Sequence, residues 1–214
     1  MIKLGFLKRL IGEEPGLFQQ IVHSGDKGHF GEYLTEYALN NYNIKGYGKT
    51  LHNIYVPYRG KTSEIDVLLI HEKGFFVFES KNYAGWIFGD TEQKNWTQVL
   101  PNKQKSHFYN PILQNKTHIN ALSKFLEMEP NKFRSYIIFS ERCELKKVPE
   151  DTESYFIVRR PNMLKWLRKE LETKETIYTK EQIDEYYNIL YPLTQVTQEE
   201  KQKHIDEIKE NHPK

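Results

Sequence analysis

The stretch DVLLIHEKGFFVFESKNYAG, residues 66–85, decides the fold because it reads as two apolar strands joined by a short turn. Three charged residues, Asp66, Glu79 and Lys81, occupy positions where this pattern favours apolar side chains. The link HEKG, residues 71–74, is short enough for a tight hairpin. The stretch therefore predicts two adjacent antiparallel strands that carry charges inside the core.

The register of this hairpin places the charges on one face of the sheet. Side chains alternate along a strand with a period of two, so a turn of even length pairs Ile70 with Phe75. Counting outward from that pair puts Asp66 opposite Glu79, with their Cβ atoms about 4.5–5.5 Å apart. Lys81 lies on the same face, one step beyond Glu79. A turn of odd length would shift this register by one residue.

Two facing carboxylates among apolar neighbours are destabilising unless their charge is relieved. One of them can keep its proton through a raised pKa, or a cation can bind between them. Carboxylate oxygens suit Mg²⁺ or Mn²⁺, and a lysine beside such an ion can stabilise a hydroxide or a phosphate oxygen. The pattern is therefore equipped for phosphodiester hydrolysis. The alternative is a salt bridge between Lys81 and Asp66 or Glu79 that has no chemical role.

The remaining sequence predicts a mixed α/β fold, with a central mixed sheet flanked by helices. A stripe that includes Phe30, Leu34 and Tyr37 indicates a helix within residues 24–42. Asn110 suits the N-cap and Pro111 the first position of a second helix. The other expected elements are listed by their residues: strands at 49–58, 63–70 and 74–83, a weaker hairpin at 84–90 and 94–100, short buried strands at 134–140 and 154–158, and helices at 160–171 and 179–191.

Length and composition limit the class of protein. The chain has 214 residues and a formal net charge of +2, which suits one domain with an appended tail and argues neither for nor against nucleic acid. Its single cysteine, Cys143, excludes an internal disulfide and a zinc site built from several cysteines. No run approaches the ~18 apolar residues of a membrane span. We expect a cytoplasmic protein with no membrane association.

The motif formed by Asp66 and the ESK of residues 79–81 resembles the D-x(n)-E-x-K signature of the PD-(D/E)XK nuclease superfamily. The surrounding segments FGEYLTEYAL, TSEIDVLLIHEKGFFVFESKNYAGWI and NPILQNKTHINAL resemble the nuclease-related domain (NERD) family. This resemblance implies a restriction-endonuclease-like core. It divides the chain into an N-terminal extension (1–28), the NERD domain (29–172) and a C-terminal helical extension (173–214).

The resemblance also implies roles for individual residues around a Mg²⁺ or Mn²⁺ ion. Asp66 and Glu79 would be acidic metal ligands, with the backbone carbonyl of Ser80 as a third. Lys81 would position or activate the attacking water. Glu32, in the GE pair of the first helix, would lie beside the metal, directly or through water. Periodicity alone does not aim Glu32 at the site.

Four further residues are candidates for substrate binding. Gln114 and His118 match a Q-x-x-x-H element that approaches the site, which makes Gln114 a candidate catalytic residue as well. Their spacing of four places them on one helix face. Tyr83 follows the motif closely and could stack on a base or simply pack in the core. Lys116 could contact a phosphate or belong to a solvated helix face.

Three functions remain open from the sequence. The first is a Mg²⁺-dependent enzyme that hydrolyses DNA. The second is a non-catalytic module that binds nucleic acid or assembles with DNA-processing proteins. The third is a metal-dependent phosphoesterase that acts on RNA. The sequence does not separate this function from the first, because no reader of the 2′-hydroxyl is visible. The choice between endonuclease and exonuclease, and the oligomeric state, are also left open.

Overall fold

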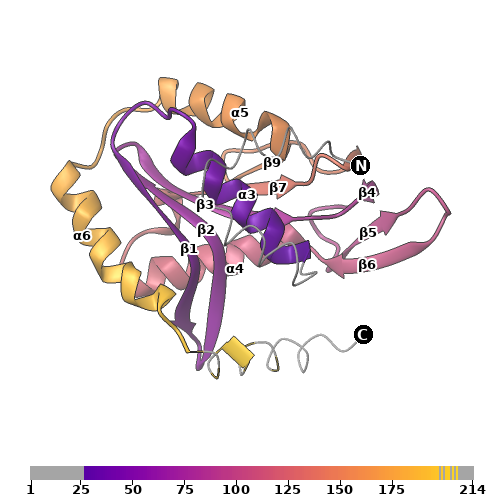
Figure 1. The fold of residues 1–214 in the computed structure, drawn as a ribbon, viewed down its shortest axis with the longest axis horizontal. Helices are drawn as coiled ribbons and strands as arrows, with labels where there is room; N and C mark the ends of the chain where they lie inside the picture. Colours follow the sequence, from indigo (N-terminus) through magenta and orange to yellow (C-terminus); the bar gives the residue numbers. More distant parts are fainter. Residues whose placement is uncertain (1–26, 198, 200, 203, 205, 207–214) are drawn as a thin grey trace.

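The computed structural model describes residues 27–197 together with residues 199, 201, 202, 204 and 206 (Figure 1). Apart from residues 27 and 28, the predicted N-terminal extension lies outside the described residues, and the predicted domain boundaries remain predictions. The elements in chain order are α3 (Lys27–Asn41), β1 (Gly48–Tyr58), β2 (Lys61–His71), β3 (Gly74–Lys81), β4 (Gly85–Phe88), β5 (Asn95–Val99), β6 (Lys105–Tyr109), α4 (Pro111–Phe125), the 3₁₀ helix η1 (Pro130–Lys132), β7 (Phe133–Phe139), β8 (Cys143–Lys147), β9 (Tyr155–Arg159), α5 (Arg160–Thr173), α6 (Lys180–Leu190) and the 3₁₀ helix η2 (Tyr191–Thr194).

The central sheet has five strands in the order β1-β2-β3-β7-β9. The first three strands form an antiparallel meander, whereas β3, β7 and β9 run parallel to one another. This confirms the predicted α/β class with a mixed central sheet, as expected for a restriction-endonuclease-like core. The β1–β2 hairpin turns through Arg59 and Gly60, which both have positive φ (51° and 74°), as a two-residue turn between twisted strands favours.

A second sheet has four strands in the order β6-β5-β4-β8. The antiparallel pairing of β4 with β5 confirms the predicted weaker hairpin. The sequence did not predict β6 or β8, because KSHFY and CELKK are short and mostly exposed. Such strands show no apolar alternation, so their hydrogen bonds to β5 and β4 are what define them.

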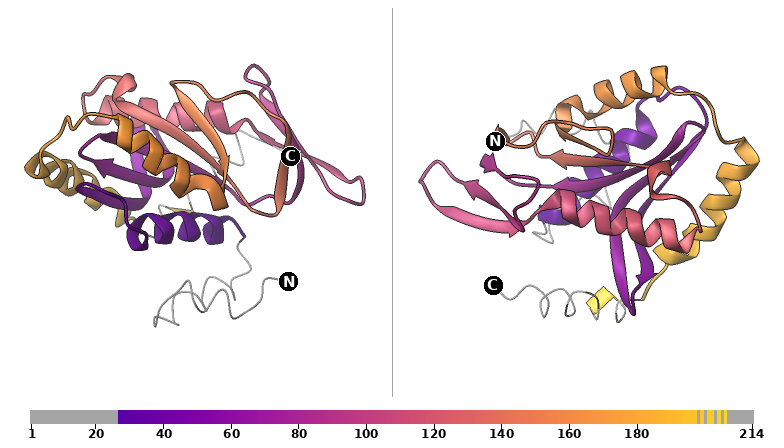
Figure 2. Two further views of the ribbon diagram at one scale, coloured as in Figure 1. Left: turned by 90° about the horizontal axis from the view of Figure 1, so that it is seen from above. Right: turned by 180° about the vertical axis from the view of Figure 1, so that it is seen from behind.

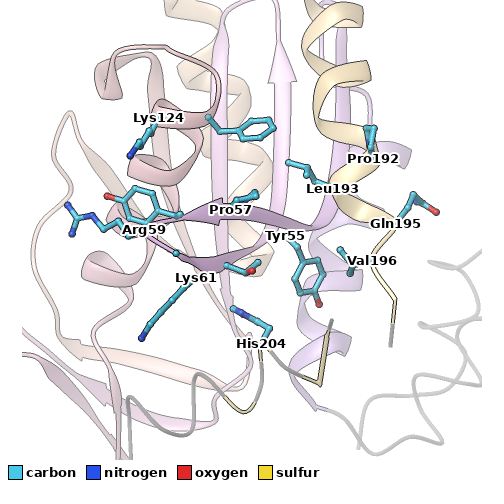
Figure 3. A pocket seen from close by; sticks show the side chains of 14 residues that line it. Tyr55, Pro57, Arg59, Lys61, Lys124, Pro192, Leu193, Gln195, Val196 and His204 are labelled. Atoms are coloured by element: carbon cyan, nitrogen blue, oxygen red, sulfur yellow. The ribbon is translucent and has the colours of Figure 1, made fainter. Parts of the chain in front are cut away.

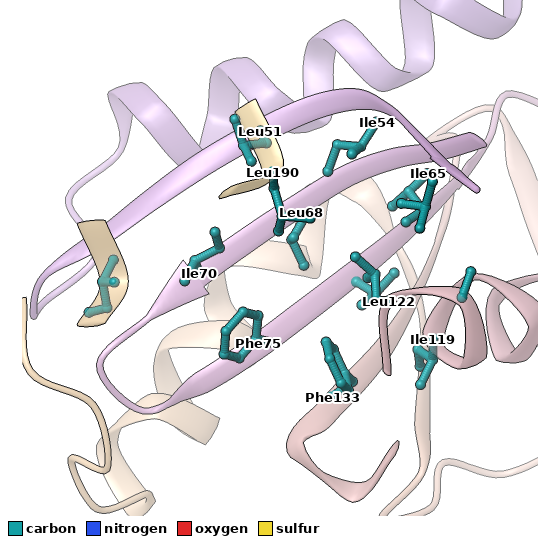
Figure 4. Close-up of a cluster of buried hydrophobic side chains, with 14 residues drawn as sticks. Leu51, Ile54, Ile65, Leu68, Ile70, Phe75, Ile119, Leu122, Phe133 and Leu190 are labelled. Atoms are coloured by element: carbon teal, nitrogen blue, oxygen red, sulfur yellow. The ribbon is translucent and has the colours of Figure 1, made fainter. Parts of the chain in front are cut away.

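Helices cover both faces of the central sheet, with α3 and α5 on one side and α4 on the other (Figures 1 and 2). Side chains of α4 and α6 share one apolar cluster with the sheet, in which Leu68, Phe75 and Leu122 are fully buried (Figure 4). Burying each such side chain contributes about 1.5–3 kcal/mol relative to leaving it exposed. Within the described residues, no helix is long and apolar enough to cross a bilayer.

The predicted helix is present as α3, but the stripe through which it faces the sheet is not the one formed by its larger apolar residues. Its buried residues are Gly31, Thr35 and Leu39, whereas Phe30 and Leu34 are only half-buried. The small side chains of Gly31 and Thr35 let the helix approach the strands closely. The buried face is therefore the one with the smallest side chains, and the larger apolar residues lie beside it. Glu32 follows Gly31 directly and therefore lies at the edge of this contact.

The alternation of side chains is interrupted midway along the β1–β2 hairpin. Two residues on each strand belong to the same apolar cluster although they are three positions apart: Leu51 and Ile54 on β1, and Ile65 and Leu68 on β2. Asn53 lies at the interruption on β1 with φ of +48°, and the ladder skips its pairing with Asp66. Asp66 therefore lies at an irregular position of β2, where the regular alternation of side chains between the two faces of the sheet does not apply.

Candidate active site

The site lies where strands β2 and β3 separate. Their register follows the prediction through the last pair of the ladder, Val67 with Phe78. Asp66 and Glu79 lie one step beyond that pair. There the Ser80 backbone N–H donates a hydrogen bond of 2.7 Å to Oδ2 of Asp66. A carboxylate thus takes the place of a neighbouring strand for this amide, which keeps the buried N–H satisfied while the strands part.

One cavity of about 620 Å³ opens at this fork. Seven of the predicted site residues line it: Glu32, Asp66, Glu79, Ser80, Lys81, Tyr83 and Gln114. His118 does not line the cavity but contacts Glu79 from α4. Lys116 is exposed on α4, outside the lining. The Tyr83 ring packs on Phe108, with 4.3 Å between the centroids, so it forms part of the wall.

Helix α4 supplies partners for the charges on β3. Lys81 Nζ lies 2.6 Å from Oε1 of Glu79 and donates a hydrogen bond of 2.9 Å to Oε1 of Gln114. The other oxygen of Glu79 is 3.1 Å from Nε2 of His118, whose Nδ1 lies 2.7 Å from the Ser63 hydroxyl. The shared face predicted for Gln114 and His118 thus brings both side chains to the same pair of charges.

The start of α4 is fixed by Asn110, as predicted. Its side-chain oxygen accepts a hydrogen bond of 2.9 Å from the N–H of Ile112, and its amide donates to three carbonyls in the loop after β4. Asn110 is completely buried. The cap therefore joins the helix to that loop and fixes the position of α4, and with it the positions of Gln114 and His118 relative to the sheet.

The two carboxylates at the fork have opposite pKa shifts. Burial alone would raise the pKa of Glu79, but the Lys81 ammonium and the His118 hydrogen bond outweigh it and lower that pKa. Burial would likewise lower the pKa of Lys81, but the charges of Glu79 and Asp66 raise it. Glu79 and Lys81 therefore hold each other in the charged form.

Within the part of the chain that the structure describes, no cation lies within ion-pair distance of Asp66. Burial raises its pKa well above the usual range, and the nearby charges of Glu79 and Glu32 add to this effect. Lys81 and the Ser80 amide act in the opposite direction without reversing it. This is the first of the two remedies expected for facing carboxylates, in which one of the pair keeps its proton.

Close packing of α3 on β3 brings Glu32 to the cavity. A Cβ atom at Gly31 would lie 3.0 Å from Nη2 of Arg160 and 3.1 Å from Oγ of Ser80, which is tighter than ordinary contact. The glycine therefore permits an approach that other residues would hinder. This is the physical reason for the GE pair, since the residue that follows the contact is the one that reaches the cavity.

Sequence reasoning missed Arg142, which also lines the cavity. Its Nη2 donates to the backbone oxygen (2.9 Å) and the side-chain oxygen (2.8 Å) of Asn82. A signal was available, because β3 and β7 are parallel and their carboxyl ends meet at the same edge of the sheet. Residues shortly after the predicted strand at 134–140 were therefore candidates for the site.

A larger cavity of about 840 Å³ lies at the tip of the β1–β2 hairpin (Figure 3). Its described lining contains Arg59, Lys61 and Lys124 and no aspartate or glutamate. We place the candidate active site in the smaller cavity, because of the two it is the one where carboxylates and a lysine converge.

The donor atoms at the fork suit a hard divalent cation. Asp66, Glu79 and Glu32 present carboxylates to one cavity, which is the ligand type that Mg²⁺ and Mn²⁺ prefer. Among the described residues, no three or more His, Cys, Asp or Glu side chains lie together as a group that could hold a metal ion. An ion at this site would therefore have at most two of these carboxylates as direct ligands, with waters completing its coordination, which is usual for Mg²⁺.

The chain matches one family model and a relative of similar length. Residues 27–140, more than half of the chain, match the family model described as the nuclease-related domain (NERD). An uncharacterized protein of Bacillus anthracis is 31% identical over 181 residues, which cover 84% of this chain and 82% of that protein. No solved structure matches. The chain therefore belongs to the nuclease-related domain family, within the general context of the PD-(D/E)XK superfamily.

Proposed function

We propose that this protein is a metal-dependent nuclease that hydrolyses phosphodiester bonds of DNA. The observation that carries the proposal is the convergence of Asp66, Glu79 and Lys81 at the fork of two core strands. Two carboxylates and an ammonium are costly to bury, and a packed core would gain more from apolar residues. Membership of a nuclease-related family supports the interpretation that these charged side chains are buried because they serve catalysis.

Four residues would hold the metal ion, which we propose to be Mg²⁺ or Mn²⁺. Asp66, Glu79 and the backbone carbonyl of Ser80 would bind it directly, and Glu32 would lie beside it and bind through a water molecule. The ion, when bound, would supply Lewis-acid stabilisation of the negative charge that develops on the phosphoryl oxygens. Its charge would also favour the ionised form of Asp66, whose pKa burial otherwise raises.

Lys81 and Gln114 would act on the water and the scissile phosphate. The raised pKa of Lys81 keeps its ammonium charged, so it orients an attacking water or binds a phosphate oxygen as a hydrogen-bond donor. Gln114 holds the ammonium from α4 at 2.9 Å. His118 positions Glu79 in the same way, because it contacts the carboxylate oxygen that Lys81 does not.

One observation favours a second candidate, a non-catalytic module that binds nucleic acid or assembles with DNA-processing proteins. Both oxygens of Glu79 have protein partners, and Lys81 contacts Glu79 at 2.6 Å, which is the simple salt bridge considered from the sequence. A module of this kind would bind DNA whether or not Asp66 and Lys81 are present. On either reading we propose that the protein works in the cytoplasm, where its nucleic-acid substrate would be found.

The test is cleavage of linear, circular and single-stranded DNA by the purified full chain with Mg²⁺, Mn²⁺ or EDTA. The Lys81→Ala variant should lose at least ~100-fold in rate, as loss of one charge-stabilising donor does in other enzymes. Lys132→Ala is the matched control, because Lys132 is exposed and outside the cavity.

Cleavage that survives Lys81→Ala would rule out this site as the catalytic centre. A folded parent protein that cleaves nothing with either metal, yet binds DNA equally with and without the Asp66→Asn change, would favour the non-catalytic module. Circular dichroism of each variant separates loss of chemistry from loss of fold.

A further inference from the structure

Strands β5 and β6 form a two-stranded arm that extends away from the body of the molecule (Figures 1 and 2). We call residues 95–109 the arm. Residues 101–107, which include its turn and most of β6, are all exposed. Gln98 and Leu100 on the arm line the candidate active-site cavity. The arm is therefore an extension of the cavity wall into solvent.

The base of the arm is held firmly. The Trp96 side chain is completely buried, donates from its indole nitrogen to the Asp90 carbonyl at 3.0 Å, and stacks on Phe139 with 6.0 Å between centroids. Gln98 donates to the Ala84 carbonyl at 2.7 Å. These contacts fix the direction of the arm relative to the fork, so a molecule held by the arm would have a defined position at the cavity.

The charge of this part of the chain has one sign. No aspartate or glutamate occurs from residue 93 to residue 126, although the whole chain contains 29. Lys94, Lys103 and Lys105 fall at the base and tip of the arm, all exposed. Within the described structure, neither Lys103 nor Lys105 lies within ion-pair distance of a carboxylate. A polyanion is the partner that such a surface fits.

The turn at the tip holds a lysine where the backbone favours glycine. The Lys103 N–H donates to the Leu100 carbonyl at 2.8 Å, and Lys103 has φ of +66°. Three-residue hairpin loops with this geometry usually place glycine at the left-handed position, because a side chain is unfavourable there. The conformational cost of Lys103 brings no packing gain at an exposed tip, which points to a use for its charge.

We infer that the arm binds double-stranded DNA beside the candidate active site, so that the substrate is a B-form duplex. This inference rests on the proposed function and adds its substrate class. The major groove of B-form DNA is about 12 Å wide and admits a two-stranded β-ribbon. Lys103 and Lys105 contact phosphates at its edge, and the fixed base directs the adjoining backbone to the fork.

The composition of the arm disfavours the other nucleic acids. Single strands are usually held by aromatic side chains that stack on bases, but residues 101–107 include no Phe, Tyr or Trp. Two aromatic residues of the arm, Trp96 and Phe108, pack inward, since both belong to an apolar cluster. Double-stranded RNA has a deep and narrow major groove that such a ribbon does not enter.

The test compares the parent protein with a Lys103→Gly/Lys105→Gln double variant. Binding to a 20-base-pair duplex is measured by fluorescence anisotropy in EDTA over a range of salt concentrations. The variant should bind at least ~10-fold more weakly near 100 mM salt, and its slope of log K against log salt should fall by about 2. Its Tm should be no lower than that of the parent, because glycine suits the positive φ of residue 103.

The matched control is Lys165→Gln/Lys169→Gln, which removes two exposed lysines from α5. It should bind the duplex like the parent. Single-stranded DNA, double-stranded RNA and poly-glutamate serve as competing ligands. The parent should prefer the DNA duplex by at least ~10-fold over each, and the arm variant should lose most of that preference.

Equal duplex binding by the parent and the arm variant would overturn the inference. If the arm variant loses the same factor in affinity for every polyanion, the choice of a duplex is wrong. If the parent binds poly-glutamate as tightly as DNA, the arm binds an acidic protein instead. Lys81→Ala separates the two proposals, because it should retain arm-dependent duplex binding. If the parent binds duplexes through the arm but cleaves no substrate, only the nuclease proposal fails. If the parent and the arm variant cleave duplexes at the same rate, only this inference fails.

Discussion

The two ends of the β2–β3 strand pair both contain buried residues but differ in the kind of side chain they bury. At the hairpin end the ladder is complete to its last pair, His71 with Gly74, and Phe75 is fully buried among aromatic rings. At the fork end the ladder stops before Asp66, and Glu79 is buried to 1% exposure. The same two strands thus build a core at one end and a charged site at the other.

The two ends differ in the interactions that stabilise their buried side chains. Apolar residues at the hairpin end need only close contacts, which many neighbours supply. Each charge at the fork needs a particular partner, and for Glu79 and Lys81 those partners include His118 and Gln114 on α4. Substitutions at the hairpin end should therefore lower stability without changing the chemistry. Substitutions at the fork should change the chemistry, and they should lower stability only where they leave a buried charge unpaired.

The largest effect is expected from Phe75→Ala at the hairpin end. The ring contacts Phe133, Tyr178 and Tyr186, with centroids 5.3, 5.4 and 5.1 Å away. Its loss should lower the free energy of unfolding by about 3–5 kcal/mol, measured by urea denaturation. Phe75→Leu is the control and should cost less than about 1.5 kcal/mol. Cleavage per folded molecule should not change, and a selective loss of activity would contradict this expectation.

The next effect tests the fork with Lys81→Met. Removing one partner of a buried ion pair leaves Glu79 uncompensated, so unfolding should become easier by about 3 kcal/mol. Adding Glu79→Leu makes the fork as apolar as the hairpin end and should restore most of this loss. Neither variant should cleave DNA. A double variant less stable than Lys81→Met would show that the pair stabilises the fold beyond satisfying its own charges.

A smaller effect is expected from Gly31→Ala, which crowds the contact between α3 and β3. The added methyl group would meet Arg160 and Ser80 at about 3.0–3.1 Å, and overpacking of this kind costs about 1–3 kcal/mol. Displacement of α3 should also reduce cleavage, because Glu32 moves with it. Glu32→Gln is the control that removes the charge without crowding. Wild-type activity in Gly31→Ala would show that the position of Glu32 is not critical.

The smallest effect concerns pH and Asp66. Because burial raises the pKa of Asp66, the folded protein binds more protons than the unfolded chain from about pH 3.9 up to the raised value. The free energy of unfolding should therefore fall as pH rises through this window, by about 1.4 kcal/mol per pKa unit. Asp66→Asn should remove this fall in EDTA, making the variant the more stable protein above the window and equal to the parent below it. Parallel pH profiles in urea denaturation would contradict the shift.

The sequence predicted the part of this site that depends on strand geometry. The HEKG turn and the period of two sufficed for the register of β2 and β3, and Asn110 with Pro111 sufficed for the start of α4. Alternation failed at Asp66 because the positive φ of Asn53 interrupts the hairpin, and no apolar pattern encodes such a backbone conformation.

Tertiary contacts that do not follow the apolar periodicity of a strand or helix were not predictable in this way. The stripe of larger apolar residues identified helix α3 but not its buried face, because small residues made the closest approach to the sheet. Arg142 was missed because it follows its strand in a loop, where periodicity carries no information. The family resemblance, and no physical argument from periodicity, led to Glu32.

The hydrogen bond between the Ser80 amide and Asp66 makes one backbone proton a reporter on the site. Its exchange with deuterium is slowed by a side-chain carboxylate, whereas its neighbours on β3 are protected by the β2 and β7 ladders. Any event that changes the charge or position of that carboxylate should alter the exchange of this amide before it alters the rest of the sheet. Hydrogen exchange resolved to single residues could therefore follow occupation of the fork in a protein whose overall shape stays the same.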